Sequence, residues 1–416
     1  MTRKTHLRPT DVQGASRLAI DATLGLTRLV ESMHHNIARV PGPLGAFSAA
    51  PTRGIAGLVY RSIQGTTRLV GFGIDALLGQ LLPLLKTEPA ESSTPREAIL
   101  AALNGVLGDH LAASENPLAI PMQFRREGQA LRLASAELAA AMPQANGRIL
   151  VLVHGLCRSD LQWRRKDHDH GASLARDAGY TAVYLHYNSG LHVSTNGRAF
   201  ADLLENLLQA WPVTVEELAI VGHSMGGLVA RSACHYGGRA QQAWLQHLRH
   251  LVFLGTPHHG APLERGGNWI DVLLELSPYT AALARLGKIR SAGITDLRHG
   301  SILDDDWQHG DRFARGGKRT LVPLPEGVAC HAAAAVLAKN PRHPGKGLLG
   351  DGLVPLPSAL GHGRTRHQSL GIPAAQTWVG HGMNHLDLLD SDEVYRQLRH
   401  WLGAVPGVPG PSAQCD

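Results

Sequence analysis

Aromatic residues and cysteines are scarce in this chain of 416 residues. Phenylalanine, tryptophan and tyrosine make up 5% of the sequence, and the four cysteines are Cys157, Cys234, Cys330 and Cys415. They are scattered and show no C-x-x-C spacing. This pattern fits a reduced compartment or incidental buried thiols better than a disulfide framework.

Long apolar runs and blocks of one charge are also missing. The most apolar window, residues 69–85, contains Asp75 and Pro83 and is shorter than a membrane-spanning helix requires. The N-terminal stretch MTRKTHLRPTDVQG is polar and no uninterrupted apolar core follows it, which argues against a secretory signal. The net charge of +6 is modest and no basic stripe is interleaved with aromatic residues, so we expect no nucleic-acid partner. The sequence predicts a cytoplasmic protein, with membrane association left open.

The first 115 residues show apolar stripes with helical spacing. One stripe predicts a helix over 15–40, a second covers 59–81, and a third helix is expected to begin at Thr94-Pro95. We therefore predict an N-terminal helical segment, 1–115. It either packs on the main domain, where it could also form a homo-oligomer contact, or acts as a peripheral membrane or lid-like element.

From about residue 116 the pattern changes to alternating strands and helices. A hairpin is expected around 122–133, followed by strands at 149–153, 181–187, 218–221, 251–254 and 375–379, and helices at 200–211, 228–236 and 394–402. The alternation favours a mostly parallel sheet covered by helices, which forms one domain over 116–405. The pattern breaks over about 262–325, which predicts a cap insertion, and 406–416 is expected to be a flexible tail.

The most informative motif surrounds a serine. An apolar run at 217–221 leads into Gly222-His223-Ser224-Met225-Gly226, and a helical pattern follows. This order of strand, sharp turn and helix is that of a nucleophile elbow, G-x-S-x-G. The alternative is a structural turn with the same sequence. In an elbow the hydroxyl of Ser224 is exposed, and the amide of Met225 at the helix N-terminus points to a developing oxyanion.

A serine nucleophile needs a histidine base and a carboxylate that orients it, in the chain order Ser, Asp or Glu, His. The candidate acid is Asp351, between two glycines, with the run 304–306 as an alternative. The candidate base is His385, on a loop after the last expected strand, with His381 as a competitor.

The second oxyanion donor is expected in the turn after the strand 149–153, where we choose the amide of Leu156. Loops at the same end of an open α/β sheet line its ligand site. The residues predicted to contact substrate are His154, Gly155, His223, Thr256 and His258. Neither the adjacent pair His258 and His259 nor the run 167–170 is interpreted as a metal site, and no P-loop or dinucleotide fingerprint is present.

Taken together, the motifs resemble those of the α/β-hydrolase superfamily. They are V-H-G-L, G-H-S-M-G-G-L-V-A-R, G-T-P-H-H-G-A-P, D-G-L-V-P and G-M-N-H-L-D-L-L. More narrowly, they are similar to the lipase-like branch that includes bacterial triacylglycerol lipases and GPI inositol-deacylase-like proteins. The resemblance covers about 118–404 and implies an α/β-hydrolase fold with Ser224, Asp351 and His385 as nucleophile, acid and base. The first 115 residues and the lack of a secretion signal depart from the secreted members.

The sequence therefore predicts a serine carboxylic-ester hydrolase that acts through an acyl-enzyme on a small-molecule or lipid ester, with no cofactor. Two alternatives stay open. An acyltransferase or thioesterase would use the same triad, and a non-catalytic scaffold would use the N-terminal helices to assemble or to contact membranes.

Overall fold

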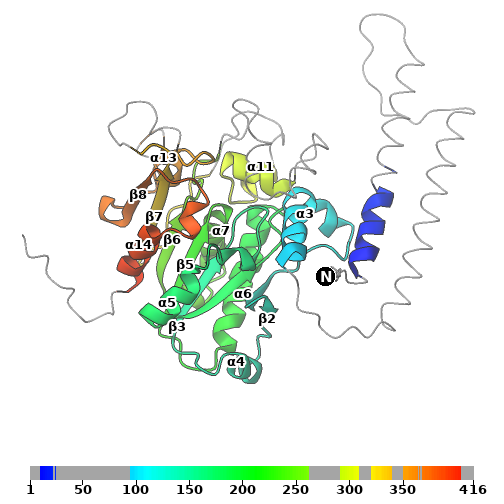
Figure 1. The fold of residues 1–416 in the computed structure, drawn as a ribbon, viewed down its shortest axis with the longest axis horizontal. Coiled ribbons are helices and arrows are strands. Elements are labelled where there is room, and N and C mark those ends of the chain that lie inside the picture. Colours follow the sequence, from blue (N-terminus) through cyan, green and yellow to red (C-terminus); the bar gives the residue numbers. More distant parts are fainter. Residues whose placement is uncertain are drawn as a thin grey trace, which may run out of the picture. The chain divides into compact units, whose positions relative to one another are not determined.

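The computed structural model describes residues 10–21, 24, 94–261, 291–308, 320–339, 350–363, 365 and 368–403. Figure 1 draws the described helices and strands as coloured ribbons. By its internal contacts the chain divides into two compact units. The first comprises Met1–Arg96 and Leu111–Ala119, and the second Glu97–His110 and Ile120–Asp416. The predicted division between 115 and 116 stays a prediction, as does the flexible tail, which lies outside the described residues together with the predicted helix over 59–81.

In the first unit, residues 10–21 and 24 are helical, which agrees with the start of the helix predicted over 15–40. The rest of that helix lies outside the described residues. The carboxylate of Asp11 accepts a hydrogen bond from Nε of Arg96 at 2.7 Å. The side-chain amide of Asn116 donates to the carbonyl of Gly14 at 3.0 Å. Helix α3, Thr94–Ala113, begins at the predicted Thr-Pro start.

Within the described residues of the second unit, eight strands form one sheet in the order β2-β1-β4-β3-β5-β6-β7-β8. The strands β3 to β8 pair in parallel, whereas β1 pairs antiparallel with both β2 and β4. The bounds are β1 Gln123–Arg126, β2 Gln129–Ala130, β3 Arg148–Val153, β4 Thr181–His186, β5 Glu217–His223, β6 Leu248–Leu254, β7 Ala329–Val336 and β8 Thr377–His381.

Helices cover the sheet on both faces. Their bounds are α4 Ser135–Ala141, η1 Asp160–Trp163, α5 His170–Ala178, α6 Val193–Ala210, α7 Met225–Arg239, α8 Trp244–His247, α11 Ala292–His299, α12 Asp305–Gln308, α13 Leu356–Ala359, η4 Ala374–Gln376, η5 Asp387–Leu389 and α14 Asp392–Leu402. Among the described residues, no helix combines the length and apolarity that a bilayer crossing requires.

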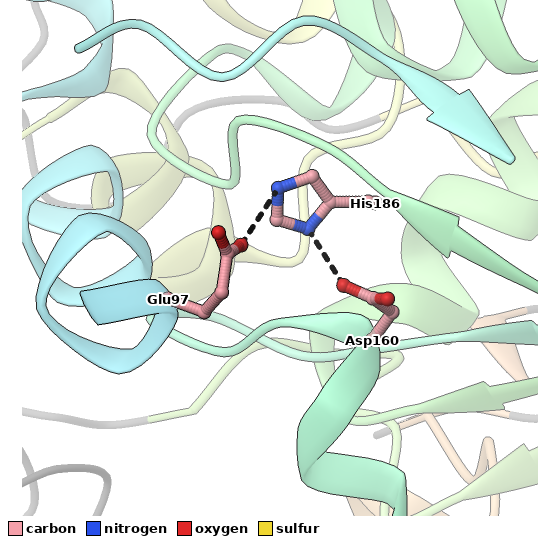
Figure 2. Close-up of side chains that lie close together, drawn as sticks. All are labelled: Glu97, Asp160 and His186. Atoms are coloured by element: carbon pink, nitrogen blue, oxygen red, sulfur yellow. Dashed lines mark ion pairs between the residues drawn. The ribbon is translucent and has the colours of Figure 1, made fainter. Parts of the chain in front are cut away.

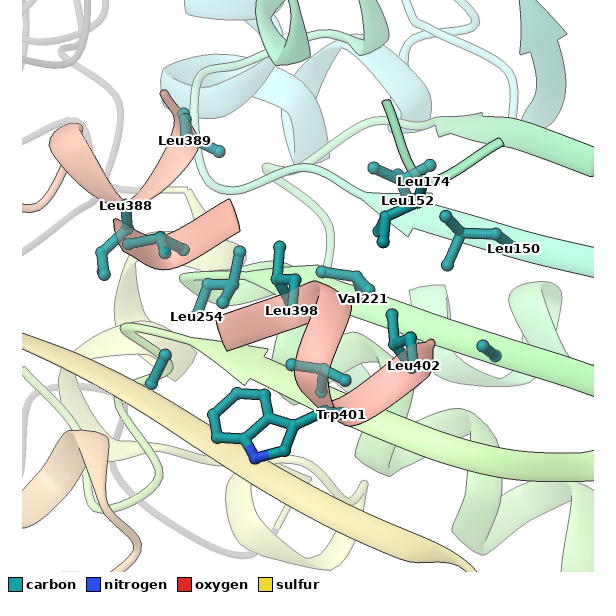
Figure 3. Packing of buried hydrophobic residues seen from close by; sticks show 14 of the residues in the cluster. Leu150, Leu152, Leu174, Val221, Leu254, Leu388, Leu389, Leu398, Trp401 and Leu402 are labelled. Atoms are coloured by element: carbon teal, nitrogen blue, oxygen red, sulfur yellow. The ribbon is translucent and has the colours of Figure 1, made fainter. Parts of the chain in front are cut away.

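The core on one face of the sheet forms because side chains alternate along each strand. Leu150 and Leu152 of β3 share this face with Val221 of β5, and all three are fully buried. Figure 3 shows Leu398 and Trp401 of α14 over this face of the sheet, where Trp401 stacks on His331 of β7 with ring centroids 4.8 Å apart. Helix α5 adds further apolar side chains to this cluster, while α7 packs against β3, β5 and β6 from the other face.

The described part of the predicted cap insertion contains α11 and α12 and packs on loops that follow the parallel strands. The amide of Gly293 donates to the carbonyl of Gly190, after β4, at 3.0 Å. The carboxylate of Asp296 accepts from the amide of Val193 at 2.8 Å. The insertion therefore contacts the sheet at its carboxyl end, where ligands of open α/β sheets bind.

The predicted hairpin and the predicted strands all appear, with ends shifted by a few residues. Strand β7 was not predicted, since its sequence ACHAAAAV is rich in alanine, a residue depleted in strands. Its residues 330–336 are nevertheless buried, because β7 pairs with both β6 and β8 inside the sheet. Tertiary burial here outweighs local propensity.

His331 of β7 provides a test of this packing by pH. Burial, with a smaller contribution from His250, lowers the pKa of His331 from 6.5 to about 4. As the pH falls below 6.5, the unfolded state therefore binds the proton first, and stability present above that pH is lost toward pH 4.

We expect His331→Phe, which preserves the ring stacked on Trp401, to remove part of this pH dependence. Between pH 7 and pH 5 the wild type should lose about 1 kcal/mol more stability than the variant, after allowance for solvent screening. Urea unfolding at both pH values measures the difference. Equal losses in the two proteins would contradict the assignment.

Candidate active site

The turn between β5 and α7 holds Ser224 in a strained conformation. Its φ is 54° and its ψ is −122°, values that a residue with a side chain rarely adopts. The turn is fixed on both sides, because the amide of Ser224 donates to the carbonyl of Leu254 at 2.8 Å and its carbonyl accepts from the amide of Gly227 at 3.1 Å. This is the local geometry of a nucleophile elbow.

The glycines of the motif allow the strand and helix to approach closely. A Cβ on Gly222 would lie 2.6 Å from the backbone of Gly227, and a Cβ on Gly226 would overlap the carbonyl oxygen of Val153. A Cβ on Gly227 would overlap the hydroxyl of Thr256. Each glycine of this turn is therefore required by its neighbours in the fold.

Asp351 lies in a loop that fixes its carboxylate. The oxygen Oδ1 accepts from the amides of Leu353 at 3.0 Å and Val354 at 2.8 Å. The flanking Gly350 and Gly352 have φ values of +62° and +96°, which glycine adopts at little cost. The loop thus orients the second oxygen, Oδ2, and the residue as a whole is buried.

The imidazole of His385 meets that oxygen. Nδ1 of His385 donates to Oδ2 of Asp351 at 2.7 Å, and the amide of His385 donates to the carbonyl of Asp351 at 3.2 Å. Gly255, at the end of β6, lies against the ring, since a Cβ there would come 3.0 Å from Nδ1. The other ring nitrogen, Nε2, is buried and makes no hydrogen bond within the described part of the chain.

The elbow and the histidine loop lie side by side. The ring centroids of His223 and His385 are 4.7 Å apart, and Nε2 of His223 lies 3.2 Å from the carbonyl oxygen of His385. The structure thus brings His385 next to the residue that precedes Ser224. It does not select the competitors: His381 is exposed at the end of β8, and Asp304 pairs instead with Arg198.

The turn after β3 lies against the elbow from the other side. A Cβ on Gly155 would come 3.0 Å from the Cβ of Ser224. The amides of Leu156 and Met225, predicted as oxyanion donors, make no backbone hydrogen bond among the described residues. These two N–H groups belong to Met225, which follows Ser224, and to Leu156, which follows the Gly155 that lies against Ser224.

His154, which begins this turn, is held by an aromatic residue that the sequence analysis did not identify. The ring of Tyr187 stacks on His154 with centroids 4.3 Å apart, and its hydroxyl donates to the carbonyl of His154 at 2.8 Å. Burial lowers the pKa of His154 to about 3, so the ring is neutral at physiological pH. The sequence around Tyr187 does not predict this contact, because His154 lies on a different segment of the chain.

The other residues predicted to contact substrate are buried around the elbow. His223, Thr256 and His258 have no exposed surface, and Nδ1 of His258 lies 3.4 Å from the guanidinium of Arg231. Burial also lowers the pKa of His223 well below its usual value. Their role in substrate contact stays a prediction.

One group of side chains that could ligate a metal ion lies outside the serine motif. In the described part of the chain, Glu97, Asp160 and His186 each offer a ligand atom within 4.8 Å of the others, and all three are buried (Figure 2). In the run 167–170, Asp169 instead caps helix α5 by accepting from the amide of Ala172 at 3.0 Å.

A family of known proteins matches the centre of the chain. Residues 144–324 match the PGAP1-like alpha/beta domain. The matched segment contains the elbow, the turn after β3 and the loop after β6, whereas Asp351 and His385 follow it. The predicted resemblance to this branch of the α/β hydrolases is confirmed, and so is the α/β-hydrolase fold with its mostly parallel sheet. No curated protein matches the chain.

Solved structures that are similar to part of this chain include proteins named as lipases and one named as a lipase-esterase related protein. The mature lipase BlEst2 of Bacillus licheniformis is 19% identical, with a TM-score of 0.40, over 62% of this chain and 92% of that one. Lipase B of Aspergillus fumigatus is 13% identical, with a TM-score of 0.36, over 64% and 57%. A lipase-esterase related protein of Clostridium acetobutylicum is 12% identical, with a TM-score of 0.33, over 62% and 95%.

The packing of the elbow predicts opposite effects for two glycines of α7. Gly226→Ala should destabilise the protein by about 1–3 kcal/mol, because its Cβ meets rigid backbone of β3. Gly238→Ala is the matched control, since the nearest atom to its Cβ is 3.8 Å away. We expect it to be neutral or to stabilise by up to about 1 kcal/mol. Chemical denaturation compares the two variants, and equal stability would contradict the proposed close approach.

Proposed function

We propose that this protein is a serine carboxylic-ester hydrolase that acts through an acyl-enzyme intermediate. Ser224 is the nucleophile, His385 the general base and Asp351 the acid that orients it. One observation carries the proposal: a buried carboxylate accepts from Nδ1 of His385 at 2.7 Å, while Nε2 makes no hydrogen bond to any of the residues that the structure describes. A triad histidine works in this way, with one nitrogen held and the other available for a proton.

The reaction follows from these positions. Nε2 of His385 accepts the hydroxyl proton of Ser224 as its oxygen attacks the ester carbonyl, and Asp351 stabilises the resulting imidazolium. The amides of Leu156 and Met225 donate to the oxyanion of the tetrahedral intermediate. His385 returns its proton to the leaving alcohol. Water then attacks the acyl-enzyme while His385 accepts one of its protons, and His385 returns that proton to the oxygen of Ser224 as the carboxylic acid is released.

The electrostatics of the surroundings support a single base. His154 and His223 lie beside the same turn, but burial lowers the pKa of each, so that both stay neutral. Neutral neighbours do not oppose the positive charge that develops on His385 during catalysis. Asp351 faces His385 with the one oxygen that its own loop leaves unused.

The substrate proposed is a small-molecule or lipid ester. Helix α11 of the insertion packs on the loops at the carboxyl end of the sheet, where it can contribute to the binding site. The steps above need water and the ester alone. Where an alcohol or thiol competes with water for the acyl-enzyme, the same groups perform acyl transfer.

The triad predicts a large loss of activity in two variants. Ser224→Ala should lower kcat by about 10³-fold or more, and Asp351→Asn by about 10²- to 10⁴-fold, because the imidazole then loses its orienting charge. A panel of p-nitrophenyl esters of increasing acyl length measures both effects. Reaction with a fluorophosphonate probe should label wild type at Ser224 and leave Ser224→Ala unlabelled.

The matched control is Ser135→Ala, which changes an exposed serine at the start of α4 and should leave labelling and kcat unchanged. Circular dichroism of each variant checks that the fold is intact. A folded wild type that neither reacts with the probe nor cleaves any ester of the panel would overturn the proposal. So would full activity of Ser224→Ala.

A further inference from the structure

Helix α3 precedes the segment that matches the family, yet its central part belongs to the sheet unit. Residues Glu97–His110 of α3 group with that unit, whereas the family match begins at 144. Ala101 and Ala102 of the helix are fully or almost fully buried. Such burial indicates that this helix is part of the domain core, and its contacts show which part of the domain it supports.

The first contact is with the turn that carries the amide of Leu156. A Cβ on Gly105 would lie 2.9 Å from the Cα of Cys157 and 3.0 Å from its nitrogen, and would overlap its sulfur. Cys157 is fully buried and has a φ of 57°, a value that residues with side chains rarely adopt. The strained residue next to Leu156 is therefore held directly against the backbone of α3.

The second contact runs through the loop after β4. The side-chain amide of Asn188 donates to the carbonyl of Gly108 at 2.9 Å. The next residue, Ser189, accepts through its hydroxyl from the amide of Cys157 at 3.0 Å. Helix α3 thus holds the loop that in turn fixes the amide direction of Cys157.

The third contact is a cluster of the buried Glu97, Asp160 and His186, which Figure 2 shows, together with the half-buried Arg125. The imidazole of His186 lies between two carboxylates, with Nε2 3.7 Å from Glu97 and Nδ1 3.1 Å from Asp160. The guanidinium of Arg125 is 2.9 Å from Glu97 and 3.4 Å from Asp160. The two carboxylates face the guanidinium of Arg125 and the opposite nitrogens of the His186 ring. These four side chains form one network. A metal at this place would lie against the arginine.

This cluster lies next to the beginning of the same turn. The ring centroids of His186 and His154 are 6.2 Å apart, and Tyr187, the neighbour of His186, binds the carbonyl of His154. Glu97 is therefore connected to the start of the turn at His154, and Gly105 to its later part at Cys157. Gly155 and Leu156 lie between these two points of support.

We propose that α3 is a positioning element of the active site, which holds the turn 154–157 at both ends and so fixes the amide of Leu156 for the oxyanion. Glu97 and Gly105 are its positioning residues. The inference rests on the proposed function, since the oxyanion belongs to ester cleavage. A misplaced oxyanion donor lowers the stability of the transition state and leaves substrate binding almost unchanged.

The test introduces a methyl group where α3 meets the turn. Gly105→Ala should lower kcat ten- to hundredfold with KM changed less than threefold, because loss of one oxyanion donor costs about 10²–10³ in kcat. Affinity for a trifluoromethyl ketone analogue, which forms the oxyanion, should fall by the same factor as kcat. Gly238→Ala on α7 is the control and should leave kcat and analogue affinity unchanged.

A second substitution tests whether the new methyl group acts through its contact with Cys157. Cys157→Ala removes the sulfur that the new methyl group would overlap, and its own kcat and analogue affinity serve as the reference for the double variant. In the double variant with Gly105→Ala it should restore a large part of kcat and of analogue affinity. Such coupling between two residues in contact is what a double-mutant cycle measures.

Glu97→Gln tests the support at the beginning of the turn, next to His154. It also provides a separate measurement in the case that Gly105→Ala does not fold. It preserves the shape of the side chain and removes its charge, and should lower kcat about threefold or more with KM unchanged. Glu115→Gln, an exposed acid beyond the helix, is its control. Both proteins are compared by the same analogue and by thermal unfolding.

Two results would overturn the inference. One is wild-type kcat and analogue affinity in folded Gly105→Ala and Glu97→Gln. The other is a loss that scales with reduced thermal stability, raises KM equally and is not restored by Cys157→Ala, which would indicate general destabilisation. Failure of the proposed function has a different signature, since wild type would then be unreactive toward the fluorophosphonate probe.

Discussion

The close approach of β3, β5 and α7 at the elbow is the constraint on which the rest of the site depends. Gly222 and Gly226 allow backbone to contact backbone there, and Ser224 adopts a positive φ as a consequence. The strain persists because parallel strands on both sides fix the ends of the turn. A site on such a turn keeps its serine in place without a ligand.

The buried pair of Asp351 and His385 depends on hydrogen bonds to its carboxylate. A carboxylate removed from water is unfavourable unless hydrogen bonds replace its hydration. Here two backbone amides and one imidazole nitrogen supply them. Within the described part of the chain, the hydrogen bonds to this carboxylate come from its own loop and from His385. The pair also meets the elbow, because Nε2 of His223 lies 3.2 Å from the carbonyl oxygen of His385.

The carboxylates around His186 also have partners of opposite charge, and one of them, Glu97, belongs to α3. These two buried carboxylates face one half-buried arginine and one buried histidine, so charges of opposite sign meet at this place. Buried ion networks favour a specific arrangement of the elements that carry them, since each alternative leaves a charge unpaired. This explains how a helix distant in sequence acquires a defined place beside the turn after β3.

The sequence by itself determined the features that depend on local pattern. The elbow, the hairpin and the parallel strands other than β7 follow from apolar runs and glycine positions, and chain order selects Asp351 and His385 as candidates. Only the tertiary structure decided the alanine-rich strand β7, the stacking of Tyr187 on His154, and the contacts of α3 through Glu97 and Gly105. Those features arise from contacts between residues far apart along the chain, and neither the propensity nor the spacing of nearby residues records such contacts.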